Sequence, residues 1–234
     1  MKYNIIGIDT SLTSCGMYIL MKDGTEHYYN YRNNDKLSKW HKLLNGIITY
    51  RDYYMPTIKD YSKQEVQKLK KYKEITDIIV NDILKHCKPE ETIIVTEGYS
   101  YSSSNTISLI DLIGYATLLR SQLISLNFHD FIIKSPSTLK LETCQITYIP
   151  EEKHIGGKNP RTEYIWKNNE GISGGSFKKP QMLQAIYENE KITNKFKTIL
   201  LTYRSELLEM KAIPKPTDDM SDAILLVYTT LFNI

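Results

Sequence analysis

The feature that most constrains the fold of this chain is a run of β-branched residues at positions 92–96. The run reads Thr-Ile-Ile-Val-Thr and has no alternating charged position. Such a run is typical of a central strand covered on both faces, whereas a strand with one solvated face alternates apolar and polar residues. The chain is therefore expected to build a sheet that has helices on both sides.

The start of the chain predicts antiparallel strands next to this central strand. Apolar runs at 3–9 and 17–20 flank a polar turn, and a third strand-like run at 27–31 follows Asp23 and Gly24. Asp-Gly is a strong turn signal between two strands. We therefore expect the fold to open with a meander of three antiparallel strands.

Helical and strand-like segments alternate in the rest of the chain. Helical patterns extend over 37–86, with a break near Met55-Pro56 and a regular part at 62–85, and then over 109–126, from 135 onward, and over 180–188, 195–210 and 221–232. One more strand is expected at 128–134. The prediction is an α/β fold of the ribonuclease H-like kind: a mixed five-stranded sheet, with three antiparallel opening strands followed by parallel strands, flanked by helices.

The length of the chain indicates one domain with an insertion. At 234 residues, 1–234 fits a single compact domain. Residues 142–173 contain several glycines and show no sustained period, so we expect a long loop or small insertion there.

Composition excludes some classes of protein. Hydrophobic residues make up 41% and charged residues 24%, which argues against a disordered chain. We find neither a signal-peptide pattern nor an apolar run near the roughly 20 residues of a membrane span. The three cysteines are widely spaced, which fits neither a disulfide framework nor a zinc site and predicts a reducing intracellular compartment. The net charge of +3 permits a nucleic-acid partner without requiring one.

Carboxylates stand at the ends of predicted elements. Asp9 ends the first strand, Glu97 ends the central strand, and Asp219 and Asp222 share one face at the start of the last helix. Converging carboxylates are the ligands that Mg²⁺ prefers. Each acid also has an ordinary alternative: a helix cap, above all for Asp218, or a solvated strand end.

These carboxylates lie in segments that together resemble a known family. Residues 7–16, Gly-Ile-Asp-Thr-Ser-Leu-Thr-Ser-Cys-Gly, are similar to the opening motif of the RuvC-like Holliday junction resolvases, which belong to the ribonuclease H-like superfamily. Residues 94–97 resemble the second motif of that family, and 219–223 resemble its terminal motif. The resemblance implies that two Mg²⁺ (or Mn²⁺) ions are bound by the catalytic residues Asp9, Glu97, Asp219 and Asp222, with Asp218 as a substitute for Asp219.

The resemblance extends to basic and aromatic residues. Residues 134–140 and 174–182 are similar to two lysine-bearing segments of the family, which implies that Lys140 and Lys179 contact DNA phosphates. The family places an aromatic residue just after the glutamate, where this chain has Tyr99 and Tyr101, so these tyrosines are expected to bind DNA by stacking. For both lysines the alternative is an ordinary solvated charge.

The function implied by the resemblance is resolution of four-way DNA junctions. It implies a homodimeric, structure-selective endodeoxyribonuclease that hydrolyses paired phosphodiesters by two-metal chemistry and takes branched DNA, without a membrane or a nucleotide cofactor. A related nuclease acting on flaps or RNA–DNA hybrid stays open, as does a non-catalytic DNA-binding relative. An actin-like kinase or ATPase is less favoured, because it needs a second lobe and no second glycine-rich phosphate loop follows Glu97.

The predicted insertion has its own composition. It carries the basic or imidazole residues Lys153, His154, Lys158, Arg161 and Lys167 among the aromatic residues Tyr148, Tyr164 and Trp166. Such a mixture suits phosphate contacts and stacking on unpaired bases. The alternative is a tolerated surface loop. On either reading, we expect a short linker to replace 142–173 without loss of the fold.

Overall fold

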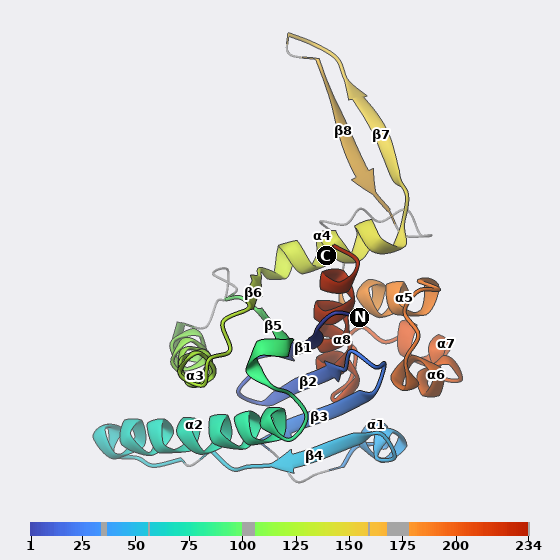
Figure 1. Cartoon of the computed structure of the whole chain (residues 1–234). Helices are drawn as coiled ribbons and strands as arrows, with labels where there is room; N and C mark the ends of the chain where they lie inside the picture. The colour runs from blue at the N-terminus through green and yellow to red at the C-terminus, as the bar shows by residue number, and fades with distance from the viewer. Residues whose placement is uncertain (34–36, 56, 100–105, 159, 168–177, 234) are drawn as a thin grey trace.

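The computed structural model describes residues 1–33, 37–55, 57–99, 106–158, 160–167 and 178–233. Its main sheet has six strands in the order β4-β3-β2-β1-β5-β6 (Figure 1). The strands are β1 (Asn4–Asp9), β2 (Ser14–Leu20), β3 (Glu26–Arg32), β4 (Ile48–Asp52), β5 (Thr92–Glu97) and β6 (Phe131–Lys134).

The pairing of the strands confirms the predicted mixed sheet. β1, β2 and β3 form an antiparallel meander, and β5 pairs in parallel with β1. β6 then pairs in parallel with β5, so the carboxyl ends of β1, β5 and β6 lie at one edge of the sheet. The residues at 92–96 accordingly form a strand with neighbours on both sides, and all five are buried.

The sixth strand corrects the prediction of a helix over residues 37–86. That region contains α1 (Lys39–Leu44), then β4, and only then α2 (Tyr61–Leu84). β4 extends the sheet by pairing in parallel with β3. The prediction of helix was wrong here because the strand is short. Its Ile48 and Tyr50 side chains, two positions apart, both pack on the hydrophobic core.

Helices cover both faces of the sheet. The remaining helices are the short η1 (Pro89–Glu91), α3 (Thr106–Ser125), α4 (Pro136–Thr147), α5 (Lys179–Glu188), α6 (Lys195–Leu201), α7 (Arg204–Leu208) and α8 (Thr217–Leu231). The single helix expected at 195–210 is thus two short ones. Ile6 and Ile8 of β1 pack in the core formed with α2 and α3, whereas Ile5 packs in the core formed with α8 and the other helices.

Two glycines let α8 lie directly on the sheet. A Cβ atom at Gly16 of β2 would lie 2.5 Å from the carbonyl oxygen of Asp219, and a Cβ atom at Gly7 of β1 would collide with the carbonyl oxygen of Ala223. Glycine inside a strand often marks such a close approach of another backbone. The first turns of α8 are thereby held against β1 and β2.

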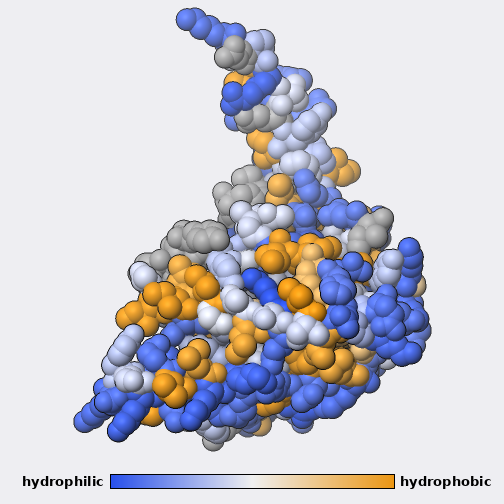
Figure 2. All heavy atoms as spheres, turned by 60° about the vertical axis from the view of Figure 1, so that its left-hand side comes forward, coloured by the Kyte–Doolittle hydropathy of each residue, from blue (hydrophilic) through white to orange (hydrophobic). Residues whose placement is uncertain are grey.

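The outer surface of α2 and α3 is partly apolar. Among the described helices, α3 alone is long and apolar enough to span a membrane by length and composition, although Tyr115, Ala116, Leu119 and Leu123 are buried in the domain. Exposed hydrophobic side chains gather on this side of the molecule (Figure 2). They include Val66 and Leu69 of α2 and Ile107 and Ile110 of α3.

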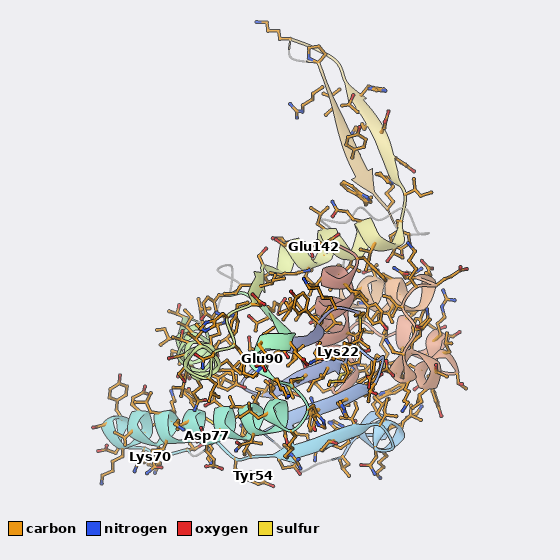
Figure 3. The ribbon with its side chains drawn as sticks, viewed as in Figure 1. Lys22, Tyr54, Lys70, Asp77, Glu90 and Glu142 are labelled. Carbon is orange, nitrogen blue, oxygen red and sulfur yellow. The ribbon has the colours of Figure 1, made fainter. Side chains whose placement is uncertain are left out.

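The segment expected to be irregular from residue 142 contains regular structure. α4 continues to Thr147, Thr143 and Cys144 are buried, and the Glu142 carboxylate accepts a 2.5 Å hydrogen bond from Lys134 Nζ (Figure 3). The expectation of irregular structure is therefore wrong for the first part of 142–173, whereas its replacement by a linker stays a prediction.

A hairpin follows α4. It consists of β7 (Pro150–Ile155) and β8 (Arg161–Trp166), which form a separate two-stranded sheet that projects away from the main body (Figure 1).

Candidate metal centre

Asp9 and Glu97 are the last residues of neighbouring parallel strands. The register of β1 and β5 pairs Ile8 with Thr96, which places the two acids side by side at the carboxyl edge of the sheet. Side chains alternate between the two faces of a strand. Gly7 and Val95, two residues earlier, face the α8 side, so Asp9 and Glu97 face it as well.

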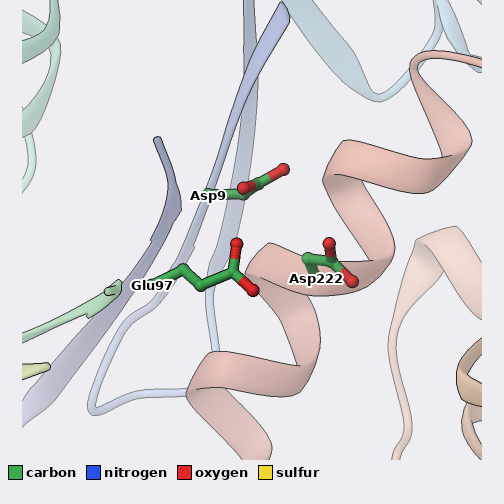
Figure 4. A group of neighbouring side chains, drawn as sticks. All are labelled: Asp9, Glu97 and Asp222. Carbon is green, nitrogen blue, oxygen red and sulfur yellow. The ribbon is translucent and has the colours of Figure 1, made fainter. Parts of the chain in front are cut away.

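Asp222 completes a cluster of three carboxylates from the other side. It lies on α8, which packs on this face of the sheet, and its side chain points toward Asp9 and Glu97 (Figure 4). One ligand oxygen from each of the three residues lies within 4.8 Å of the others. Oxygen atoms at such separations can converge on one divalent cation, which Mg²⁺ binds at about 2.0–2.1 Å.

Burial makes this cluster electrostatically demanding. Burial and the carboxylates of Asp222, Asp219 and Glu97 raise the pKa of Asp9 well above its usual range. Burial and the Asp222 charge raise the pKa of Glu97 to about 7, and burial also raises the pKa of Asp222. Like charges held close together in a buried site favour protonation or a bound cation.

The cluster fits a metal ion by one further observation. Asp222 Oδ1 is buried and accepts no hydrogen bond from any described residue. A buried carboxylate oxygen without a donor is costly, and a metal ion satisfies it. Asp9, Glu97 and Asp222 are therefore the residues that could hold a divalent cation.

Lys179 lies beside this cluster. Its ammonium pairs with Asp222 Oδ2 and lies 3.3 Å from Asp218 Oδ1. Burial alone lowers the pKa of this lysine, but the Asp222, Asp218 and Asp9 charges raise it above the usual range. The Lys179 side chain as a whole is still 41% exposed.

Asp219 is near the cluster but holds different partners. Its Oδ2 accepts hydrogen bonds from the Ser14 hydroxyl and, at 3.3 Å, from the Asn30 amide, and its Oδ1 accepts one from Lys215. Burial raises its pKa to about 6, against the opposing charge of Lys215. Among the described residues, Asp219 is not part of the group whose ligand oxygens converge.

The polar residues around Asp219 were missed by sequence analysis. Ser14 and Asn30 lie on β2 and β3, on the face that α8 covers, and Asn30 Nδ2 also donates to Ser14 Oγ at 3.1 Å. A buried polar residue in a strand that faces a helix was the available signal for both. Lys215, four residues before Asp219, also lies 3.1 Å from Asp218 Oδ2, so Asp218 pairs with lysines and not with the cluster.

The residues predicted to contact DNA lie in different surroundings. Lys140 is partly exposed on α4. Tyr99 is held against α3, because its hydroxyl accepts a 3.0 Å hydrogen bond from Arg120, whose guanidinium also lies 5.0 Å from the tyrosine ring centroid. Tyr101 and the glycine-rich turn at 174–175 lie outside the described residues.

Comparisons with known proteins find similarity in fold only. No family model and no curated protein matches the sequence. A structure of T. thermophilus RuvC in complex with a Holliday junction substrate and a structure of Thermus thermophilus RuvC are each 10% identical, with a TM-score of 0.39 over 98% of this chain and 93% of theirs. The yeast mitochondrial Holliday junction resolvase Ydc2 is 11% identical, with a TM-score of 0.49 over 97% of this chain and 77% of its own. At these identities the similarity concerns the fold and not the chemistry.

Proposed function

We propose that this protein is a divalent-metal-dependent endonuclease that hydrolyses phosphodiesters in branched DNA, with the four-way junction as its substrate. The observation that carries the proposal is the convergence of Asp9, Glu97 and Asp222 from two strand ends and a helix. Two buried carboxylates and one partly buried carboxylate, with one unsatisfied oxygen among them, form a frame for a hard cation at the edge of the sheet.

The chain's own residues divide the work at this site. Bound Mg²⁺ or Mn²⁺ would activate water and stabilise the leaving oxygen of the phosphodiester. Asp9, Glu97 and Asp222 would hold the metal, and the two strands and the helix that carry them keep the three carboxylates in place. Lys179 neutralises Asp222 before metal binds, and its exposed portion gives it access to a DNA phosphate.

A second ion requires Asp219 to change partners. We assign two ions to the working site, with Asp219 as a ligand of the second. In the structure the two oxygens of Asp219 are taken by Ser14, Asn30 and Lys215. A second ion held by Asp219 would take the place of the Lys215 ammonium, which carries the same sign of charge as the ion.

The apolar surface of α2 and α3 supports a homodimer. Leu69 is 63% exposed and Ile110 is 62% exposed, on two helices that pack on each other and are joined by the Lys68–Asp111 ion pair. Exposed apolar side chains that gather on one surface commonly mark an interface. Two copies related by a two-fold axis would present two metal centres to the two strands of a junction.

Cleavage of a substrate panel tests the proposal. End-labelled four-way junction, flap, RNA–DNA hybrid and linear duplex are each incubated with the protein in Mg²⁺, in Mn²⁺ and in EDTA. We expect paired nicks in the junction with either metal, and little cleavage of the linear duplex. Preferential cleavage of flap or hybrid would reassign the substrate, and no cleavage of any of the four would refute the nuclease.

A further inference from the structure

The β7–β8 hairpin has no role in the metal centre, yet it is the most prominent feature of the molecular outline (Figures 1 and 3). Its register pairs Pro150 with Trp166 at the base and Ile155 with Arg161 near the tip. An isolated two-stranded hairpin is only marginally stable in water. A ribbon that projects into solvent with so little core of its own is therefore suited to contact a partner.

One face of the ribbon carries a line of rings. The cross-strand pairs Pro150 with Trp166, Glu152 with Tyr164, and His154 with Thr162 share this face, because side chains alternate along each strand. The Tyr164 and Trp166 ring centroids lie 6.5 Å apart, and Trp166 packs against the main core. Tyr164, by contrast, is 55% exposed, so its ring is available for stacking.

Charge is distributed unevenly along the ribbon. The outer part of the ribbon, from 153 to 163, holds three basic residues, Lys153, Lys158 and Arg161, and one acidic residue, which is the cross-strand partner of Lys153. The acidic residues of β7 lie nearer the base, where Glu151 forms a 2.7 Å ion pair with Lys167. The outer part of the ribbon thus has a net positive charge, which complements a phosphate backbone.

We propose that the β7–β8 ribbon is a DNA-binding arm. It holds an arm of the branched substrate through phosphate contacts of its tip cations, and it places the Tyr164 ring against an unpaired base at the branch point. Base stacking on an aromatic ring together with phosphate contacts is a general mode of binding to single-stranded DNA. This inference rests on the proposed function for its substrate, but the ribbon acts in binding and not in the hydrolysis step.

Binding measured without cleavage tests the arm. Fluorescence anisotropy of a labelled four-way junction in EDTA, over a range of salt concentrations, is compared for the wild-type protein and the double variant Lys153→Ala/Lys158→Ala. Each lost phosphate contact lowers the slope of log affinity against log salt by about 0.9, so we expect the slope to fall by about two. The matched control Lys63→Ala/Lys88→Ala removes two exposed lysines of the main body and should leave the slope unchanged.

A second variant tests the stacking of Tyr164. Because a stacked base contributes about 1–3 kcal/mol, Tyr164→Ala should weaken junction binding about fivefold or more, whereas Tyr164→Phe should bind like the wild type. A junction with 2-aminopurine at the branch point should show quenching with the wild type and with Tyr164→Phe, and less with Tyr164→Ala.

The outcomes separate the arm from the proposed function. If the wild type binds and cuts junctions while every hairpin variant binds as the control does, the arm is refuted and the nuclease stands. If the hairpin variants lose binding but still cut junctions at saturating enzyme, both are supported. If the wild type binds no branched DNA, the arm falls together with the substrate assignment. Thermal unfolding of the variants should match the wild type, because the substituted side chains are exposed.

Discussion

The Lys215 ammonium donates a hydrogen bond to Oδ1 of Asp219, a carboxylate that is fully buried beneath the start of α8. This contact separates Asp219 from the three carboxylates that converge at the edge of the sheet. The site thus consists of three carboxylates that could bind a cation and a fourth, Asp219, that is paired with Lys215.

We predict that Lys215→Met strengthens binding of the second divalent ion. Removing the ammonium leaves Asp219 without its counter-ion and removes a positive charge that repels the incoming cation. Titration with Mn²⁺, followed by electron paramagnetic resonance, should show the second ion binding about tenfold more tightly, which corresponds to about 1.4 kcal/mol. Lys211→Met, an exposed lysine nearby, is the control, and an isotherm for Lys215→Met identical to that of the control would contradict the prediction.

Substitution of any one of the three converging carboxylates should abolish cleavage without unfolding the protein. Asp9→Asn, Glu97→Gln and Asp222→Asn each remove one charged ligand. Substituting a residue that only hydrogen-bonds to a metal ligand typically lowers metal affinity or activity about 10- to 100-fold. For a ligand itself we therefore expect a loss of more than about 100-fold in the rate of junction cleavage in Mg²⁺. Junction binding in EDTA should persist. Cleavage at the rate of the exposed-site control Asp130→Asn would remove that residue from the site.

Gly16, which lies beneath α8, should not tolerate even one added methyl group. In Gly16→Ala the new Cβ would lie 2.5 Å from the Asp219 carbonyl oxygen, so the helix must move. Overpacking of this kind costs about 1–3 kcal/mol, and the shift should also weaken Mn²⁺ binding. Urea denaturation and metal titration measure the two effects. Gly46→Ala, where nothing lies within 4 Å of the added atom, should change neither.

Two stacked histidines should contribute a loss of folding stability in mild acid. The rings of His27 and His86 lie 3.6 Å apart, and burial lowers the pKa of each below the ordinary value of 6.5. The unfolded chain then binds protons more readily than the folded one, so the stabilisation is complete above pH 6.5 and is lost as the pH falls through the lower folded pKa. The raised pKa values of Asp9, Glu97 and Asp219 contribute with the opposite sign, so urea denaturation at several pH values between neutrality and mild acid must compare the wild type with a histidine variant. In His27→Gln the slope of stability against pH should be smaller, and an equal slope in the variant would contradict this origin.

Lys140 should contribute to DNA binding through charge alone. Its partly exposed position on α4 is compatible with the phosphate contact that the sequence predicts. Lys140→Ala should weaken binding equally for junctions of different sequence and lower the salt slope by about one. Anisotropy with two junction sequences measures both, and a loss confined to one sequence would indicate base readout instead.

The sequence predicted the parts of the site that depend on local position. Asp9 and Glu97 could be anticipated because each ends an apolar strand, and Asp222 because a carboxylate on a buried helix needs a partner. The arrangement around Asp219 could not be anticipated, since the Ser14, Asn30 and Lys215 contacts depend on how α8 packs on the sheet. β4 was missed for a related reason, because five residues are too few for periodicity to separate a strand from a helix.

Gly7 and Gly16 allow α8 to approach β1, which carries Asp9, and its neighbour β2 closely. Mg²⁺ needs oxygen atoms at about 2.0–2.1 Å, whereas Ca²⁺ accepts about 2.3–2.6 Å and more ligands. The choice between a small and a large ion at this centre is therefore a property of the main chain as much as of the acids. A redesign for a larger ion would start by increasing the distance between α8 and the sheet at Gly7 and Gly16, and would leave the carboxylates unchanged.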